Sequence, residues 1–229
     1  MLRSVEEFRF DTHEYRLHGV VVPGVTDVMK TAGLIDGWFY DEFSLKRGQA
    51  VHRATELHDK GVLKSSSIHP VVEPFYRAYT SFLGDTGFRP LIIEAWGIDH
   101  VYRFGGMVDR VGLLNGDVAL IDIKTGGLPW WTAVQTSAYE RLLVNNYFKC
   151  NYPEEIIANA KTFKRYGLQL RNNGRYSLTH YSDPENWLDF VAALRLYRHL
   201  KRKENNDDNA INSYRDSGEE ISGYNEIRG

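Results

Sequence analysis

The chain has 229 residues, of which 42% are hydrophobic, so it is long enough to bury a core within one domain. A net charge of −2 excludes a uniformly basic nucleic-acid binder, although a local basic groove is still compatible with it. The single cysteine, Cys150, excludes a disulfide within this chain. The sequence contains neither an apolar run long enough to span a bilayer nor a signal-peptide hydrophobic segment, so we expect no membrane association and a cytoplasmic location.

The first half of the chain predicts a hairpin, two helices and two strands. Alternating apolar residues on either side of Gly19 predict a β-hairpin over residues 8–22. A helix is expected over residues 45–60, with Ser44 as its N-cap and Gly61 at its end. The next expected elements, in chain order, are a helix over about 70–84 and strands over 89–98 and 102–114.

The second half adds strands and helices that define the fold class. Asn115-Gly116 is a strong hairpin signal and predicts a third strand over 117–126. The remaining expected elements, in chain order, are a helix over 130–148, strands over 154–166 and 174–182, and a final helix that begins after Asp183-Pro184. This order predicts an α/β fold around a small mixed β-sheet flanked by helices. We expect one domain over residues 1–203, with its core at about 45–180, and a mobile polar tail over 204–229.

Three charged residues lie on predicted strands that are otherwise apolar. Asp122 and Lys124 share one face of their strand, because side chains alternate along a strand. A hairpin centred on Asn115-Gly116 pairs residues whose numbers sum to about 231, so Asp109 should lie opposite Asp122. Two carboxylates at that distance repel each other, and a divalent cation would remove the repulsion. The alternative is an ordinary acid–lysine pair on a solvated sheet face.

The motifs around these residues resemble those of a known nuclease superfamily. "GGMVDRVG" and "DVALIDIKTG" resemble motifs II and III of the PD-(D/E)XK nucleases, most closely those of the RecB-type exonuclease branch, which includes small phage-encoded enzymes. Upstream, "RGQAVHRATE" resembles a helix motif in which a histidine binds metal, and downstream "QTSAY" resembles a Q-x-x-x-Y motif. The resemblance covers about residues 15–145 and implies a restriction-endonuclease-like core, to which the alternating residues around Gly19 add an N-terminal β-hairpin.

The resemblance also implies a metal site with one or two Mg²⁺ or Mn²⁺ ions. It assigns metal ligation to His52, Asp109, Asp122 and the main-chain carbonyl of Ile123. In several branches an acid on the preceding strand assists the metal, which makes Glu94 a further candidate ligand. The alternative for Glu94 is an ion pair with a buried arginine. Some relatives bind an iron–sulfur cluster through four cysteines. We expect no such cluster here, because this chain has a single cysteine.

Catalysis is assigned to Lys124, together with the two acids Asp109 and Asp122, because a lysine beside the metal can position water or stabilise charge on phosphorus. Gln135 and Tyr139 are four residues apart and share a helix face. We expect this pair to orient Lys124 or the nucleic-acid strand. The alternatives are a surface amide at Gln135 and simple core packing at Tyr139.

Basic and aromatic residues supply candidates for nucleic-acid binding. Basic side chains displace counterions from phosphates, and aromatic side chains stack on unpaired bases. The candidates are Thr125, Trp130, Lys161, Lys164 and Arg165. Core packing is the alternative for Trp130, and a solvated polar surface is the alternative for the basic residues.

These observations predict a metal-dependent DNA exonuclease that hydrolyses phosphodiester bonds in phage-type DNA recombination, repair or processing. DNA is the expected partner, and a single-strand-binding or recombination protein is a further candidate. Two other functions stay open at this point. One is a structure-specific endonuclease on the same fold, and the other is a DNA-binding module without catalysis.

Overall fold

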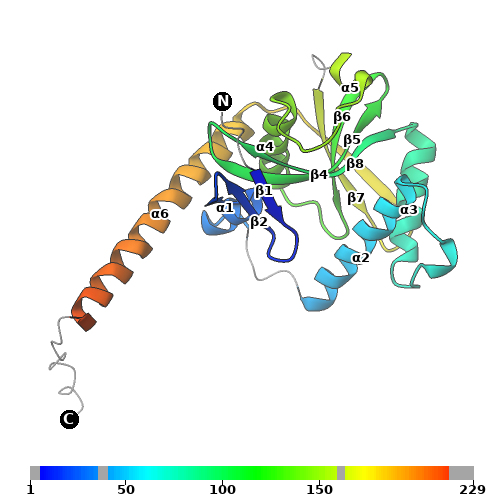
Figure 1. Ribbon diagram of the computed structural model, residues 1–229. Helices are drawn as coiled ribbons and strands as arrows, with labels where there is room; N and C mark the ends of the chain where they lie inside the picture. Colours follow the sequence, from blue (N-terminus) through cyan, green and yellow to red (C-terminus); the bar gives the residue numbers. More distant parts are fainter. Residues whose placement is uncertain (1–5, 36–40, 159–162, 217–229) are drawn as a thin grey trace, which may run out of the picture.

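The computed structural model describes residues 6–35, 41–158 and 163–216, with side chains as far as residue 206 (Figure 1). One sheet in this part of the chain is antiparallel and contains, in spatial order, β1 (Glu6–Arg9), β2 (Glu14–Leu17) and β3 (Val20–Val22). The other contains, in spatial order, β4 (Arg89–Asp99), β5 (Phe104–Leu114), β6 (Asp117–Lys124), β7 (Phe163–Leu170) and β8 (Tyr176–Tyr181). The helices are α1 (Val25–Thr31), α2 (Glu42–Asp59), the 3₁₀ turn η2 (Ser65–Ser67), α3 (Glu73–Thr86), α4 (Thr132–Val144), α5 (Glu154–Ala158) and α6 (Glu185–Asp216).

The larger sheet is mixed, as predicted. β4, β5 and β6 form an antiparallel meander, β7 pairs parallel to β6, and β8 pairs antiparallel to β7. A parallel pair needs a crossover connection, and α4 lies in the connection between β6 and β7. In Figure 1, α2 and α3 lie to one side of this sheet and α4 and α6 to the other. The α/β class with a small mixed sheet flanked by helices is confirmed, and it is consistent with a restriction-endonuclease-like core.

The central strand β6 is buried on both faces. Val118 and Leu120 belong to a core cluster with residues of α1, α4 and α6. The intervening Ala119 and Ile121 belong to a second cluster with residues of α2 and α3. Apolar packing on both faces fixes the position of β6. The strand therefore gives Asp122 and Lys124, at its C-terminal end, a well-defined backbone position.

The hairpin register predicted from Asn115-Gly116 is confirmed. The β5–β6 pairs run from Leu114 opposite Asp117 to Arg110 opposite Ile121, so each pair sums to 231. Both turn residues adopt positive φ, 52° at Asn115 and 86° at Gly116, as a tight two-residue hairpin turn requires. The next pair in this register is Asp109 and Asp122.

The N-terminal region differs from its prediction in two respects. The expected hairpin over residues 8–22 is a three-stranded sheet, because the chain turns once between β1 and β2 and again at Gly19. The predicted N-cap Ser44 is wrong. The Asp41 carboxylate accepts a hydrogen bond from the Ser44 amide at 2.6 Å, so the helix begins earlier, at Glu42.

The strand expected over residues 154–166 is also corrected. Its first part forms the short helix α5, and the strand β7 begins only at Phe163; residues 159–162 lie outside the described ranges. Pro153 supports the helical turn, because its carbonyl accepts hydrogen bonds from Ile156 at 3.0 Å and Ile157 at 3.2 Å. A strand would have needed partners for those amides in the sheet.

The final helix begins as predicted, where the Asp183 carboxylate accepts a hydrogen bond from the Glu185 amide at 2.9 Å. It continues past the expected domain boundary at residue 203 to Asp216 and extends away from the sheet (Figure 1). Residues 217–229 of the predicted tail lie outside the described part of the chain. No helix among the described residues is long and apolar enough to cross a membrane.

Gly105 is where the smaller sheet packs against β5. A β-carbon at this position would lie 2.2 Å from the Tyr15 ring, and Tyr15 is buried on the small sheet. We therefore expect Gly105→Ala to lower the free energy of unfolding by about 1–3 kcal/mol through overpacking. Urea denaturation measures the effect, with Gly84→Ala as the control, because a β-carbon at that helical glycine meets nothing within 4 Å. Equal midpoints for wild type and Gly105→Ala would show that the two sheets do not depend on this contact.

Candidate active site

Three acids lie on three neighbouring strands of the larger sheet. Ile93 pairs with Arg110 and Ala95 with Val108, so Glu94 on β4 falls opposite Asp109 on β5. On the other side of β5, the observed pairs end at Arg110 and Ile121, and continuing the register by one residue places Asp122 of β6 opposite Asp109. The paired register therefore sets the three carboxylates in a row across the sheet.

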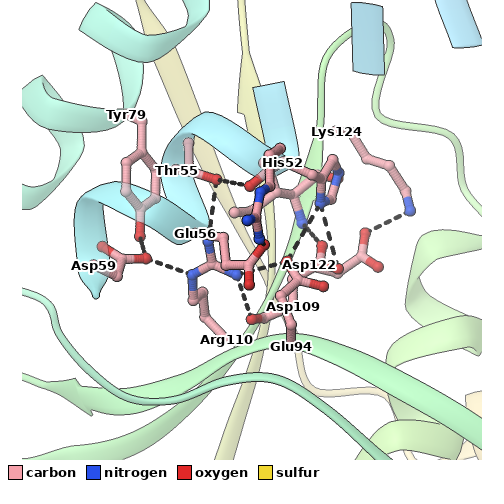
Figure 2. Close-up of polar contacts among 12 residues, drawn as sticks. His52, Thr55, Glu56, Asp59, Tyr79, Glu94, Asp109, Arg110, Asp122 and Lys124 are labelled. Atoms are coloured by element: carbon pink, nitrogen blue, oxygen red, sulfur yellow. Dashed lines mark hydrogen bonds and ion pairs between the residues drawn. The ribbon is translucent and has the colours of Figure 1, made fainter. Parts of the chain in front are cut away.

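His52 of α2 faces two of these acids and the end of β6 (Figure 2). Its Nδ1 lies 3.6 Å from Oδ1 of Asp109 and 3.8 Å from Oε1 of Glu94. Its Nε2 lies 3.1 Å from the carbonyl oxygen of Ile123. Ligand atoms of His52, Glu94 and Asp109 all lie within 4.8 Å of one another. One imidazole nitrogen among carboxylate and carbonyl oxygens is a donor set suited to a divalent cation.

Burial and mutual repulsion oppose the ionisation of the two acids Asp109 and Asp122, whereas the neighbouring carboxylates favour the charged form of His52. Burial lowers the pKa of His52, but the neighbouring Asp109 and Glu94 carboxylates outweigh it and raise that pKa to about 9. Burial raises the pKa of Asp109 above its ordinary value. Burial, with repulsion from Asp109, raises the pKa of Asp122 to about 6 in spite of the Lys124 ammonium. A cation at this position would reverse the cost of ionising both acids, so the residues fit a metal site.

Lys124 is held by two neighbours. Its Nζ lies 2.7 Å from Oδ2 of Asp122 and donates a hydrogen bond to Oε1 of Gln135 at 3.0 Å. Gln135 in turn donates from Nε2 to the Tyr139 hydroxyl at 2.9 Å. The Lys124 ammonium also lies 5.2 Å from the centre of the Trp131 ring. Gln135 and Tyr139 of α4 therefore form a hydrogen-bonded chain that ends at Lys124. This contact is compatible with the expectation that the pair orients Lys124.

A buried arginine beside Asp109 was not identified from the sequence. Arg110 is fully buried, and its Nη1 donates to Oε1 of Glu94 at 2.8 Å and its Nε to Oδ2 of Asp59 at 2.5 Å (Figure 2). Its Nη2 donates to Oγ1 of Thr55 at 3.1 Å. The Tyr79 hydroxyl donates to Asp59 at 2.7 Å. The available signal was a basic residue in the middle of the apolar strand sequence "MVDRVGLL".

The ion pair with a buried arginine, one of the two interpretations of Glu94 that the sequence left open, is present, and the carboxylate also lies beside the other candidate metal ligands. Glu94 is the partner of a buried arginine, through Arg110, and it also faces His52 and Asp109. Its φ of 48° is unusual for a residue with a side chain and marks a local distortion of β4. The distortion lies at the point where the carboxylate meets both groups.

The candidate site residues His52, Glu94, Asp109 and Lys124 line a cavity of about 1010 Å³. The predicted site residues that line it are His52, Glu94, Asp109, Ile123, Lys124, Thr125, Trp130 and Tyr139. Trp130 is 65% exposed, so it is not a core residue and can contact a ligand. Asp122 and Gln135 are buried behind Lys124 and do not line the cavity.

The predicted nucleic-acid-binding residues Lys164 and Arg165 do not line this cavity. Arg165 is buried, pairs with Oε2 of Glu140 at 2.9 Å and donates to the carbonyl oxygens of Ala133 and Asp183, so its role is structural. Lys164 forms an ion pair with Asp117, at the opposite end of β6 from the acids. Lys161 falls outside the described residues. The structure therefore does not place Lys164 or Arg165 on the surface of this cavity.

Comparisons with known proteins give only distant structural similarity. Neither a protein-family model nor a curated protein matches the sequence. LHK-Exo in complex with dAMP is 14% identical with a TM-score of 0.39, covering 83% of this chain and 94% of that chain. The alkaline exonuclease LHK-Exo from Laribacter hongkongensis is 16% identical with a TM-score of 0.32 (78% and 92%). SSO0001 is 17% identical with a TM-score of 0.30 (75% and 81%).

Proposed function

We propose that this protein is a metal-dependent nuclease that hydrolyses phosphodiester bonds in DNA. The observation that carries the proposal is that potential ligand atoms of His52, Glu94 and Asp109 lie within 4.8 Å of one another in a cavity that Lys124 also lines. A solvated acid–lysine pair would not need a histidine and a second acid at the same point. Nor would a module that only binds DNA gain from gathering carboxylates that repel the phosphate backbone.

The metal site would be formed by His52, Asp109, Asp122, the carbonyl of Ile123 and Glu94. A bound Mg²⁺ or Mn²⁺ would supply charge neutralisation and the activation of water for attack on phosphorus. Of these carboxylates, Glu94 and Asp109 line the cavity, and Arg110 keeps Glu94 in place, whereas Asp122 lies buried beside Lys124.

Lys124 is the proposed catalytic cation. Its ammonium lines the cavity and is restrained by Asp122 and Gln135, so little reorganisation is needed when negative charge develops on the phosphate oxygens. In the hydrolysis, the water oxygen bonds to phosphorus, the bond from phosphorus to the leaving sugar oxygen breaks, and that oxygen takes up a proton. Gln135 and Tyr139 position Lys124 without contacting the phosphate.

The sequence resemblance extends this proposal to an exonuclease of the RecB-type PD-(D/E)XK branch. It also favours a cytoplasmic role in DNA recombination, repair or processing of a phage type, with Mg²⁺ or Mn²⁺ as the cation. A single-strand-binding or recombination protein is the proposed partner in that role.

A cleavage time course on three DNA forms tests the proposal: end-labelled linear duplex, end-labelled single strand and covalently closed circular duplex, each with Mg²⁺, Mn²⁺ or EDTA. An exonuclease degrades the linear forms only, and EDTA abolishes the loss. Metal-dependent cutting of the closed circles would instead establish an endonuclease. DNA binding without cleavage in any metal would contradict catalysis and favour a binding module.

A further inference from the structure

Arg47 lies on α2 and lines the same cavity as His52. Five helical positions separate the two residues, which corresponds to a rise of about 7.5 Å along the helix axis. The Arg47 guanidinium lies 5.2 Å from the centre of the Phe75 ring and 5.8 Å from that of Phe43. Its Nη2 donates to the Thr125 carbonyl oxygen at 3.4 Å. These contacts hold the guanidinium between α2 and the loop after β6.

Arg47 differs from the other lysine and arginine residues that line the cavity. Lys124 pairs with Asp122 at 2.7 Å, and Arg53 pairs with Glu56 at 2.7 Å. No carboxylate of the described residues lies within ion-pair distance of Arg47, and its buried Nε has no hydrogen-bond partner among them. A guanidinium presents five donors in a planar fork, so the described residues leave most of the donor capacity of Arg47 unused.

The loop after β6 completes the surroundings of Arg47. Thr125, Gly126 and Gly127 all line the cavity, and a β-carbon on either glycine would meet nothing within 4 Å. Gln169 donates to the Gly126 carbonyl oxygen at 2.6 Å and so holds the loop. A β-carbon on Gly48 would lie 3.4 Å from Oγ1 of Thr125, which places this hydroxyl against the same turn of α2 as Arg47.

We propose that Arg47 and the Thr125 hydroxyl form a phosphate-binding subsite for a second phosphodiester of the substrate strand, next to the one that is cleaved. The proposal rests on the proposed nuclease function and deepens it. Guanidinium groups bind phosphate through paired hydrogen bonds, and hydroxyl groups add a donor. The offset of Arg47 from His52 along α2 places its charge on a neighbouring phosphate rather than on the one beside Asp109.

Salt-dependent binding tests the subsite separately from catalysis. Fluorescence anisotropy with a labelled single-stranded oligonucleotide in EDTA gives the slope of log affinity against log salt concentration. Arg47→Gln should reduce the magnitude of this slope by about 0.7, the value for one phosphate contact on a single strand. Arg47→Lys should retain most of the slope. The control is Lys46→Gln, because Lys46 neighbours Arg47, pairs with Glu42 and does not line the cavity.

Steady-state cleavage in Mg²⁺ gives the second readout. Arg47→Gln should raise KM several-fold and leave kcat within about two-fold, because binding to a phosphate that does not react is the same in the ground and transition states. A wild-type slope and KM in Arg47→Gln, with wild-type cleavage intact, would overturn the subsite and leave the nuclease in place. If Arg47→Gln fails to fold, Thr125→Val gives the alternative readout, and an unchanged KM in that folded variant would overturn the subsite. Absence of cleavage by the wild type would overturn the nuclease itself.

Discussion

Lys124→Ala is expected to reduce metal-dependent DNA cleavage by about 10²–10³-fold, the usual effect of removing one group that stabilises transition-state charge. The loss should appear in kcat, because the Lys124 ammonium acts on charge that develops only during the reaction. Its side chain is partly exposed in the cavity, so the variant should keep its fold. Single-turnover rates on linear duplex DNA in Mg²⁺ measure the effect.

The matched control for this experiment is Lys201→Ala. Lys201 lies on α6, pairs with Glu204 at 2.7 Å and does not line the cavity. The Lys201→Ala substitution removes one positive charge, as Lys124→Ala does, but it leaves the candidate site unchanged. Equal rates for wild type and Lys124→Ala would remove Lys124 from catalysis, and equal losses in both variants would reduce its effect to general electrostatics.

Arg110→Met is expected to lower the free energy of unfolding by about 3–5 kcal/mol, which is the cost of breaking a buried ion pair on one side. Arg110 is fully buried, so solvent does not screen its pairs with Asp59 and Glu94. Methionine preserves much of the apolar volume but leaves the Asp59 carboxylate, which is only 1% exposed, without its cation. Urea denaturation followed by circular dichroism measures the difference.

Arg77→Met serves as the control for the ion-pair argument. Arg77 pairs with Glu73 at 3.7 Å, and both side chains are at least half exposed, so its loss should change stability by less than about 1 kcal/mol. A comparable small change in Arg110→Met would contradict the structural role given to the Arg110 network. It would also mean that Glu94 reaches His52 without support from the arginine.

The features of the candidate site that could be predicted from the sequence are those set by neighbouring residues, namely the hairpin register and the alternation of side chains along a strand. A two-residue Asn-Gly turn sets the hairpin register, and continuing that register from the observed pairs places Asp109 opposite Asp122. Alternation along β6 places Asp122 and Lys124 on one face, where their ion pair forms. The sequence was therefore sufficient for the central part of the candidate site.

Other features depend on partners that are distant in the sequence. From the sequence Glu94 could be a ligand or the partner of an arginine, and only the fold shows that Arg110, held by Thr55 of α2, is that arginine. The sequence predicts that Arg165 is a surface cation. In the structure Arg165 is buried and donates hydrogen bonds to the carbonyl oxygens of Ala133 and Asp183, which are distant in the sequence. Asp41 and Ser44 are both good N-caps three residues apart, so pattern alone does not choose between them.

The most direct test of the central claim is the binding of Mn²⁺ measured by isothermal titration calorimetry for wild type, Asp109→Asn and Asp117→Asn. Asp109 faces His52, whereas Asp117 pairs with Lys164 at the far end of β6 and serves as the control. We predict that wild type and Asp117→Asn bind Mn²⁺ alike and that Asp109→Asn binds at least about 10-fold more weakly. Absence of binding by the wild type, or equal affinity in Asp109→Asn, would contradict a cation site formed by these acids and His52.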